Sequence, residues 1–173
     1  MRALFRKEPA ARGPTRVGAL VDEVVRLLNG QQRKHGISVT SDPADDLPPV
    51  IADAIQLQQM LLNVLRNASQ AIAAAGDGPR DIHIAFSRRG PDVLEIAVSD
   101  TGRGVNDADL GRIFERFVSS KPDGLGMGLP ISRSIVLAHG GRMWATRNPE
   151  RGITIHVELP CEPAAGPAVS GGA

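Results

Sequence analysis

The segment that most constrains the fold of this chain runs from Ile55 to Ile72. Its apolar residues recur every three or four positions and predict a helix with one face in a hydrophobic core: Leu57, Leu61, Leu65, Ala68 and Ile72. Asp53 precedes the segment and Gly76 follows it, so we expect the helix to span about residues 53–75. A helix of this kind needs a second layer to cover its apolar face.

Further helices and strands are predicted on both sides of this segment. Helical spacing predicts a helix over residues 17–34, and a third helix begins near Leu129 and ends at Gly140. Alternating apolar residues predict strands at 37–40, 82–86, 94–98, 142–146 and 153–159. We therefore predict an α/β fold: a two-layer sandwich in which a mixed, mostly antiparallel sheet is covered on one face by three helices.

Composition excludes several classes of protein. The formal net charge is +1 and aromatic residues make up 3% of the chain, so we expect no nucleic-acid partner. No apolar stretch approaches the roughly 20 residues of a membrane span, and we expect a cytoplasmic domain without direct membrane contact. Cys161 is the single cysteine and cannot form an intrachain disulfide.

The chain is expected to hold one folded domain between two flanking segments. Residues 1–16 are basic and interrupted by Pro and Gly, which favours a linker. Residues 17–160 form the expected domain. Residues 161–173 are rich in Pro, Ala, Gly and Ser, which is typical of a disordered tail.

The helix at 53–75 carries uncharged amides beside its apolar face. Gln59, Asn63, Asn67 and Gln70 are spaced by four, four and three residues and therefore line up along one side. Amide oxygens can ligate Mg²⁺, which takes one or two protein oxygens and fills its other positions with phosphates and water. The alternative is a solvated helix face, although such a face usually carries Lys and Glu. The pattern alone leaves both open.

Two glycine-containing segments are further candidates. In the first, Asp100 ends a predicted strand and precedes Gly102 and Gly104; it suits acceptance of a hydrogen bond from an amine, but a plain turn has the same residues. In the second, glycines at 124, 126 and 128 lead directly into a helix, after Lys121. Exposed N–H groups and a helix N-terminus favour phosphate binding there over a flexible linker.

These segments occur in the order and spacing found in sensor histidine kinases. Residues 53–68 resemble the N box, 100–104 the first glycine box, 113–117 the F box and 124–129 the second glycine box of that family. Residues 117–121 and the glycines after them are similar to a subgroup that includes FixL-like oxygen sensors and nitrogen-regulation kinases. The resemblance covers about residues 17–160. It implies the ATP-binding (Bergerat) fold that these kinases share with gyrase, heat-shock protein 90 and mismatch-repair ATPases.

The resemblance implies ATP and Mg²⁺ as cofactors. It assigns Asn67 to the metal, Asp100 to the adenine amine, and Asn63, Asn67 and Lys121 to catalysis. Residues 105–123 form a long loop that contains glycine, and such loops near a site usually move, so we expect them to form a lid. The residues that the resemblance implies for ATP binding are Asn63, Asn67, Asp100, Gly102, Gly104, Phe114, Phe117, Lys121, Gly124, Leu125, Gly126, Met127, Gly128 and Leu129.

The family transfers the γ-phosphoryl group of ATP to a histidine on a dimerisation domain, for relay to the receiver domain of a response regulator. Residues 1–7 look like the end of that dimerisation helix, but the acceptor histidine and the acid after it are not found before residue 17. We therefore expect a catalytic domain that depends on an acceptor held elsewhere, in a parent kinase that is membrane-anchored or soluble.

Three other functions share the fold. A gyrase-type ATPase would carry a glutamate that activates water at the position of Asn63, and an amide cannot take a proton. A serine kinase acting on an anti-sigma partner would not require the F box and Lys121. A nucleotide sensor without catalysis would not require a full set of motifs.

Overall fold

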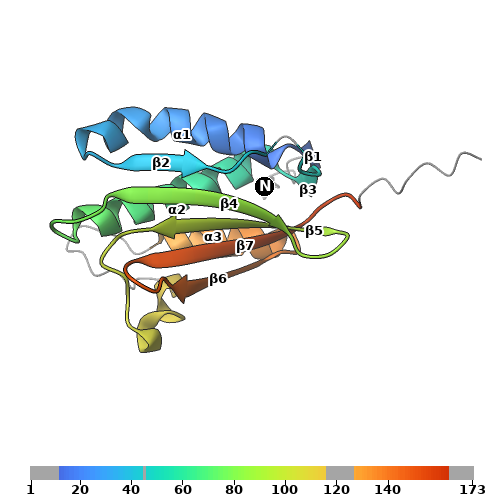
Figure 1. The fold of residues 1–173 in the computed structure, drawn as a ribbon. Coiled ribbons are helices and arrows are strands. Elements are labelled where there is room, and N and C mark those ends of the chain that lie inside the picture. The colour runs from blue at the N-terminus through green and yellow to red at the C-terminus, as the bar shows by residue number, and fades with distance from the viewer. Residues whose placement is uncertain (1–11, 45, 116–126, 164–173) are drawn as a thin grey trace, which may run out of the picture.

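The centre of the structure is a five-stranded sheet with helices on one face (Figure 1). This computed structural model describes residues 12–44, 46–115 and 127–163. The described helices are α1 (Val17–Lys34), α2 (Ala54–Ala73) and α3 (Gly128–Ala138). The described strands are β1 (Gly13–Thr15), β2 (Ser38–Ser41), β3 (Val50–Ala52), β4 (Asp81–Arg88), β5 (Val93–Asp100), β6 (Arg142–Arg147) and β7 (Ile153–Pro160), and two short 3₁₀ helices cover Asp107–Asp109 and Arg112–Phe114.

The order of strands in the main sheet is β2-β4-β5-β7-β6. β2 pairs with β4 in parallel, and the other neighbouring pairs are antiparallel. The predicted mixed, mostly antiparallel sheet and the hairpin of β4 and β5 are therefore confirmed. Ile82 of β4 lies opposite Asp100, which is the last residue of β5. Asp100 therefore lies at the end of the middle strand of the sheet, where this strand leaves the core.

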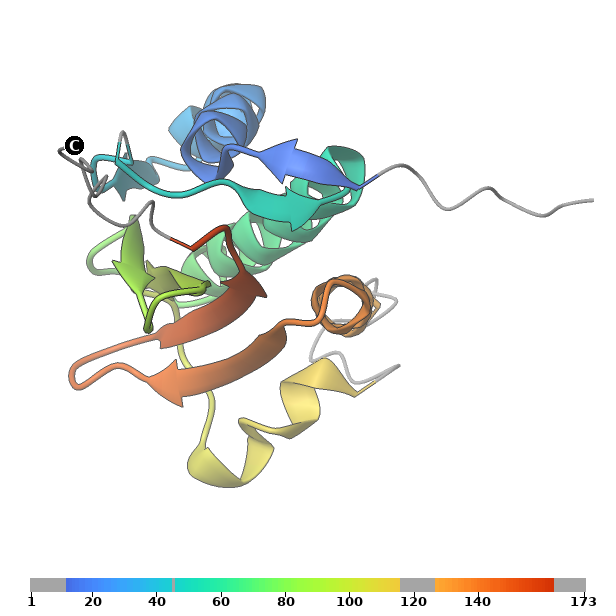
Figure 2. The same ribbon diagram turned by 90° about the vertical axis from the view of Figure 1, so that its right-hand side faces the viewer.

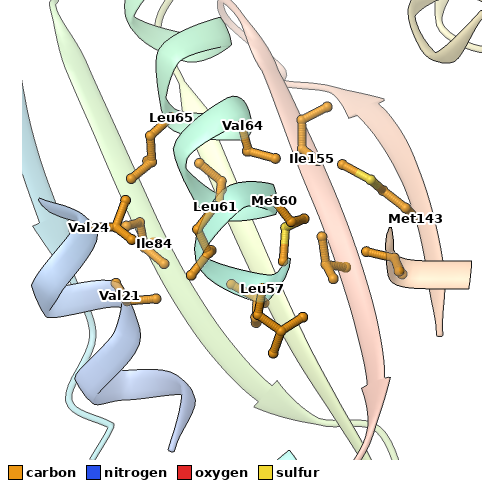
Figure 3. Packing of buried hydrophobic residues seen from close by; sticks show 14 of the residues in the cluster. Val21, Val24, Leu57, Met60, Leu61, Val64, Leu65, Ile84, Met143 and Ile155 are labelled. Atoms are coloured by element: carbon orange, nitrogen blue, oxygen red, sulfur yellow. The ribbon is translucent and has the colours of Figure 1, made fainter. Parts of the chain in front are cut away.

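α2 packs along the covered face of the sheet, and α1 and α3 flank it (Figure 2). The residues that α2 buries follow the predicted apolar pattern: Leu57, Met60, Leu61, Val64, Leu65, Ala68 and Ile72. In Figure 3, Leu61 lies near Ile84 of β4, and Val64 lies near Ile155 of β7. Burial of one such side chain contributes about 1.5–3 kcal/mol, so the buried face of α2 stabilises the domain substantially.

A second, two-stranded sheet formed by β1 and β3 was not predicted. The two strands are antiparallel, with Thr15 opposite Val50 and Gly13 opposite Ala52. Thr15 Oγ1 donates to the Ala52 carbonyl oxygen at 3.2 Å. Strands of three residues are too short for an alternating pattern to stand out. The end of the expected linker is therefore paired with the domain, and Cys161, which we placed in the tail, is buried and forms a bridge with Val50.

Glu95 departs from the alternation of apolar and exposed residues along β5. It lies on the face without helices, yet it is only 2% exposed. Arg89, Ser87 and His156 all donate hydrogen bonds to its carboxylate, with His156 Nδ1 at 2.7 Å. Burial alone raises the pKa of Glu95, but these hydrogen bonds outweigh it and hold the pKa below its ordinary value. A polar cluster therefore covers this part of the open face.

His139 connects the end of α3 to the start of α2. Its ring is buried, Nδ1 donates to the Ile135 carbonyl oxygen at 2.8 Å, and Nε2 accepts from the Asp53 backbone N–H at 3.0 Å. Both ring nitrogens are therefore satisfied by backbone groups of two helices. The sequence alone indicated only that His139 lies at a helix C-terminus, where histidine is common.

We expect His139→Ala to lower the free energy of unfolding by about 1–3 kcal/mol, because the substitution leaves the buried Asp53 N–H without an acceptor. Urea unfolding followed by circular dichroism measures the change. His83→Ala is the control, since His83 is half-exposed on the open face, and it should stay within about 0.5 kcal/mol of the native chain. Equal losses in the two variants would contradict this role of His139.

Candidate functional site

α2 begins at a capped end and holds the predicted amides along one side. Asp53 Oδ1 accepts hydrogen bonds from the N–H groups of Ile55, at 3.0 Å, and Gln56, at 3.2 Å. These bonds satisfy two N–H groups that a helix start leaves unpaired. Asn63 and Asn67 are half-buried, so they lie neither in the core nor fully in solvent. That position suits side chains that contact a ligand.

α3 runs antiparallel to α2 and brings its N-terminus to the amides. Asn63 Nδ2 donates to the Gly128 carbonyl oxygen at 3.3 Å, and Ser132 Oγ donates to the Met60 carbonyl oxygen at 3.4 Å. Among the described residues, no side chain caps the N-terminus of α3, and its first turn carries no acidic residue. A helix start of this kind favours binding of an anion such as a phosphate.

Asp100 is a buried carboxyl group, exposed by only 3%. The Gly102 N–H donates to its Oδ1 at 2.7 Å, and the Ile153 N–H also donates to it. Burial raises the pKa of Asp100 from its ordinary 3.8 to about 6, against the opposing effect of these two hydrogen bonds. Near neutral pH the group is mainly a carboxylate, and two backbone donors leave it room to accept further hydrogen bonds.

Two glycines allow the backbone to pass close to Asp100. A Cβ on Gly102 would lie 2.6 Å from the Ala71 Cβ and 2.7 Å from the Asp100 Oδ1. Gly152 has a φ of +83°, and a Cβ there would lie 1.9 Å from the Asp100 carbonyl oxygen. A side chain at either position would therefore displace Asp100, so both glycines are part of the site. Gly152 was missed by the sequence analysis because a single glycine in a turn has no distinguishing pattern.

Asn148 is a second residue that the sequence analysis missed. Its Nδ2 donates to the Asp100 carbonyl oxygen at 2.8 Å and to Ser99 Oγ at 3.0 Å, and its Oδ1 accepts from Thr154 Oγ1 at 2.6 Å. It therefore holds the backbone that carries the carboxylate. Asn148 lies 48 residues after Asp100, so no local spacing could have identified the contact.

The remaining predicted site residues fall into two groups. Phe114 is buried, with the guanidinium of Arg133 on α3 at 5.5 Å from its ring centre. Leu129 is buried in the first turn of α3, Gly104 has a φ of +68°, and Met127 is partly exposed. Phe117, Lys121, Gly124, Leu125 and Gly126 lie outside the described residues.

A cavity of about 420 Å³ lies elsewhere, between the start of α1 and the segment after β2. It is lined by residues that include Arg16, Asp22, Asp42 and Phe86, and by none of the predicted site residues. This cavity therefore does not coincide with the candidate site at Asp100, Asn63 and Asn67.

The raised pKa of Asp100 predicts a pH-dependent stability. Between about pH 4 and pH 6 the folded chain holds a proton on Asp100 that the unfolded chain has lost. This proton therefore adds to the free energy of unfolding. The contribution is fully present below about pH 3.8 and is lost as the pH rises through about 6, and it amounts to roughly 3 kcal/mol. Urea unfolding at several pH values should show this loss in the native chain and not in Asp100→Asn. Parallel pH profiles for the two proteins would contradict the assignment.

Residues 52–163 match the family described as "Histidine kinase-, DNA gyrase B-, and HSP90-like ATPase". The sensor histidine kinase TmoS of Ectopseudomonas mendocina is 32% identical over 92% of this chain and 16% of its own length. The sensor protein FixL of Bradyrhizobium diazoefficiens is 40% identical over 78% of this chain and 26% of its own length. The chain thus spans about a quarter or less of these relatives. Among the described residues, no helix combines the length and apolar character needed to cross a membrane.

Solved structures agree with these relatives. Full-length ShkA in complex with AMPPNP matches with a TM-score of 0.77 and 29% identity, over 91% of this chain and 32% of ShkA. The nucleotide-free catalytic domain of the histidine kinase ThkA matches with a TM-score of 0.73 and 28% identity, over 88% of this chain and 97% of that domain. The family match covers well over half of the chain, so this protein belongs to the histidine kinase-, gyrase B- and HSP90-like ATPases and corresponds to the ATP-binding catalytic domain of sensor histidine kinases.

Proposed function

We propose that this chain binds ATP with Mg²⁺ and transfers the γ-phosphoryl group to a histidine on a separate dimerisation domain, for relay to a response regulator. The observation that carries the proposal is the arrangement of Asp100, a buried carboxylate at the end of β5, with the amides of α2 and the uncapped start of α3. One end of this site offers a hydrogen-bond acceptor, and the other offers N–H donors.

Asp100 would select the base. Adenine carries an amine that donates a hydrogen bond, whereas guanine carries an acceptor oxygen in the same place. The carboxylate already accepts from Gly102 and Ile153, which fixes its orientation before a nucleotide arrives. This preorganisation supports adenine as the base.

Asn67 would ligate Mg²⁺, and the start of α3 would bind the phosphates. Within the described residues, no group of three His, Cys, Asp or Glu side chains gathers as a metal site. That fits a cation held mostly by phosphates and water, with one or two oxygens from the protein. When bound, Mg²⁺ neutralises phosphate charge. The N–H groups near Gly128, with Gly126 and Lys121, would neutralise the charge that develops during transfer.

In this reaction, an imidazole nitrogen of the acceptor forms a bond to the γ-phosphorus, and the bond to the β-phosphate oxygen breaks to release ADP. The chain itself supplies position and charge and needs no nucleophile. Asn63 stands where a gyrase-type ATPase carries its catalytic glutamate; an amide cannot remove a proton from water. This supports transfer to an external acceptor over hydrolysis.

The histidines of the described residues have other roles. His139 is bonded to backbone groups, His156 to Glu95 and Thr146, and His83 to Thr40 and Asp42. His35 ends α1, and its carbonyl oxygen accepts from Arg80. None of the four lies at the amides of α2 or the start of α3, which supports an acceptor outside this chain.

Incubation with γ-labelled ATP tests the function. We expect acid-labile label on an added dimerisation domain with its acceptor histidine, no label on the same domain without that histidine, and slow transfer because the two parts are not tethered. Label on this chain incubated alone would contradict the external acceptor. Release of free phosphate as the main product would favour a gyrase-type ATPase.

Asn67→Ala is expected to abolish the strengthening of ATP binding by Mg²⁺, since the substitution removes the proposed oxygen ligand. Asn67 is half-buried beside the core face, so the urea midpoint should change little. Gln59→Ala, two helical turns earlier on the same side of α2, is the matched control and should keep the Mg²⁺ effect. Calorimetry measures the affinity for ATP with and without Mg²⁺. If Mg²⁺ strengthens ATP binding to Asn67→Ala as much as to the native chain, Asn67 is not the ligand.

A further inference from the structure

Arg151, in the turn between β6 and β7, joins two segments that are distant in sequence. Its Nη2 donates to the Ala75 carbonyl oxygen at 2.8 Å and its Nη1 to that of Asp77 at 3.0 Å. Its Nε donates to the Gly102 carbonyl oxygen at 3.4 Å. A guanidinium is planar, always charged and presents several donors at once. One half-buried side chain therefore ties the end of α2 to the loop that follows Asp100.

The end of α2 lacks a cation of its own. No basic residue lies in its last turn, whereas the last turn of α1 carries Arg33 and Lys34. The carbonyl groups at a helix C-terminus are partly unpaired and carry negative partial charge. Arg151 supplies the missing cation from a turn 76 residues after Ala75. Gly78 leaves space for it, because a Cβ there would lie 2.1 Å from Nη1.

Gly102 needs a restraint from outside its own residue. Its N–H donates to the Asp100 Oδ1, so its backbone conformation sets the direction of that hydrogen bond. Glycine has the widest conformational freedom of any residue, and a larger residue cannot replace it because Ala71 occupies the space. Its carbonyl oxygen is the group that Arg151 holds. Arg151 thus limits the motion of the residue that orients the carboxylate.

Other residues of the β6–β7 turn, together with the first residue of β7, also contact Asp100. Asn148 donates to the Asp100 carbonyl oxygen, Gly152 lies against that oxygen, and the Ile153 N–H donates to the carboxylate. The turn therefore contacts Asp100 directly and reaches Gly102 through Arg151.

We propose that Arg151 is a positioning residue for base selection: through Gly102 it holds the Asp100 carboxylate in the orientation that accepts the adenine amine. The inference rests on the proposed function, in which Asp100 binds adenine. Arg151 has no contact with the nucleotide in this account. Its loss should therefore weaken recognition of the amine and leave recognition of the phosphates unchanged.

The test compares the dissociation constants of ATP and purine riboside triphosphate, which lacks the exocyclic amine and is otherwise the same nucleotide. We expect the native chain to prefer ATP by about tenfold or more. In Arg151→Ala the preference should fall to less than about threefold, while the dissociation constant of purine riboside triphosphate stays within about twofold. A purely structural role for Arg151 would weaken both nucleotides equally, and that result, or a native preference in the variant, would overturn the inference.

Two further variants make the result specific. Arg151→Lys keeps a positive charge at the end of α2 but cannot reach the carbonyl oxygens of Ala75, Asp77 and Gly102 together. It should therefore also lose the preference for ATP over purine riboside triphosphate. This variant replaces Arg151→Ala if Arg151→Ala does not fold. Arg33→Ala removes a cation from the end of a different helix, α1, and should keep the native preference. If Arg151→Lys keeps the native preference, the positioning role of Arg151 is overturned and the role of Asp100 is not affected. If the native chain binds both nucleotides equally, the role of Asp100 is overturned as well.

Discussion

The burial of Asp100 at the end of β5 is the constraint on which the rest of this site depends. A carboxyl group in that position is disfavoured as an anion, and its raised pKa reflects this cost. The cost is limited by the backbone N–H groups of Gly102 and Ile153, which donate to the carboxylate. A group that is buried, oriented and still ionised near neutral pH is suited to recognise a single polar group of a ligand.

The fold places this acceptor and the proposed phosphate-binding elements on one side of the core. β5 carries Asp100 out of the middle of the sheet, and α2 crosses the same face with its amides outward. α3 is fixed on α2 at both ends, by Asn63 with Gly128 and by His139 with the start of α2. Because these contacts use backbone atoms and helix ends, the candidate site is built on regular elements.

Much of the fold was predictable because its signals are local. The apolar repeat of α2, its cap at Asp53 and the alternation along β4 and β5 gave the elements and the type of sheet. Strands β1 and β3 were missed because three residues hold too little pattern. Asp100, Asn63 and Asn67 were predicted as site residues through their motifs. Arg151 and Asn148 were not, because their partners lie 49 and 48 residues away and their own residue types are ordinary in a turn. The burial of Glu95 likewise depends on His156, 61 residues later.

The central claim is that the buried Asp100 carboxylate selects adenine. Calorimetric titration of the native chain with ATP and with GTP, each with Mg²⁺ at neutral pH, tests it most directly. The account predicts that GTP binds roughly tenfold or more weakly, because its acceptor oxygen would face the carboxylate without a hydrogen bond. Equal affinities for ATP and GTP would contradict it.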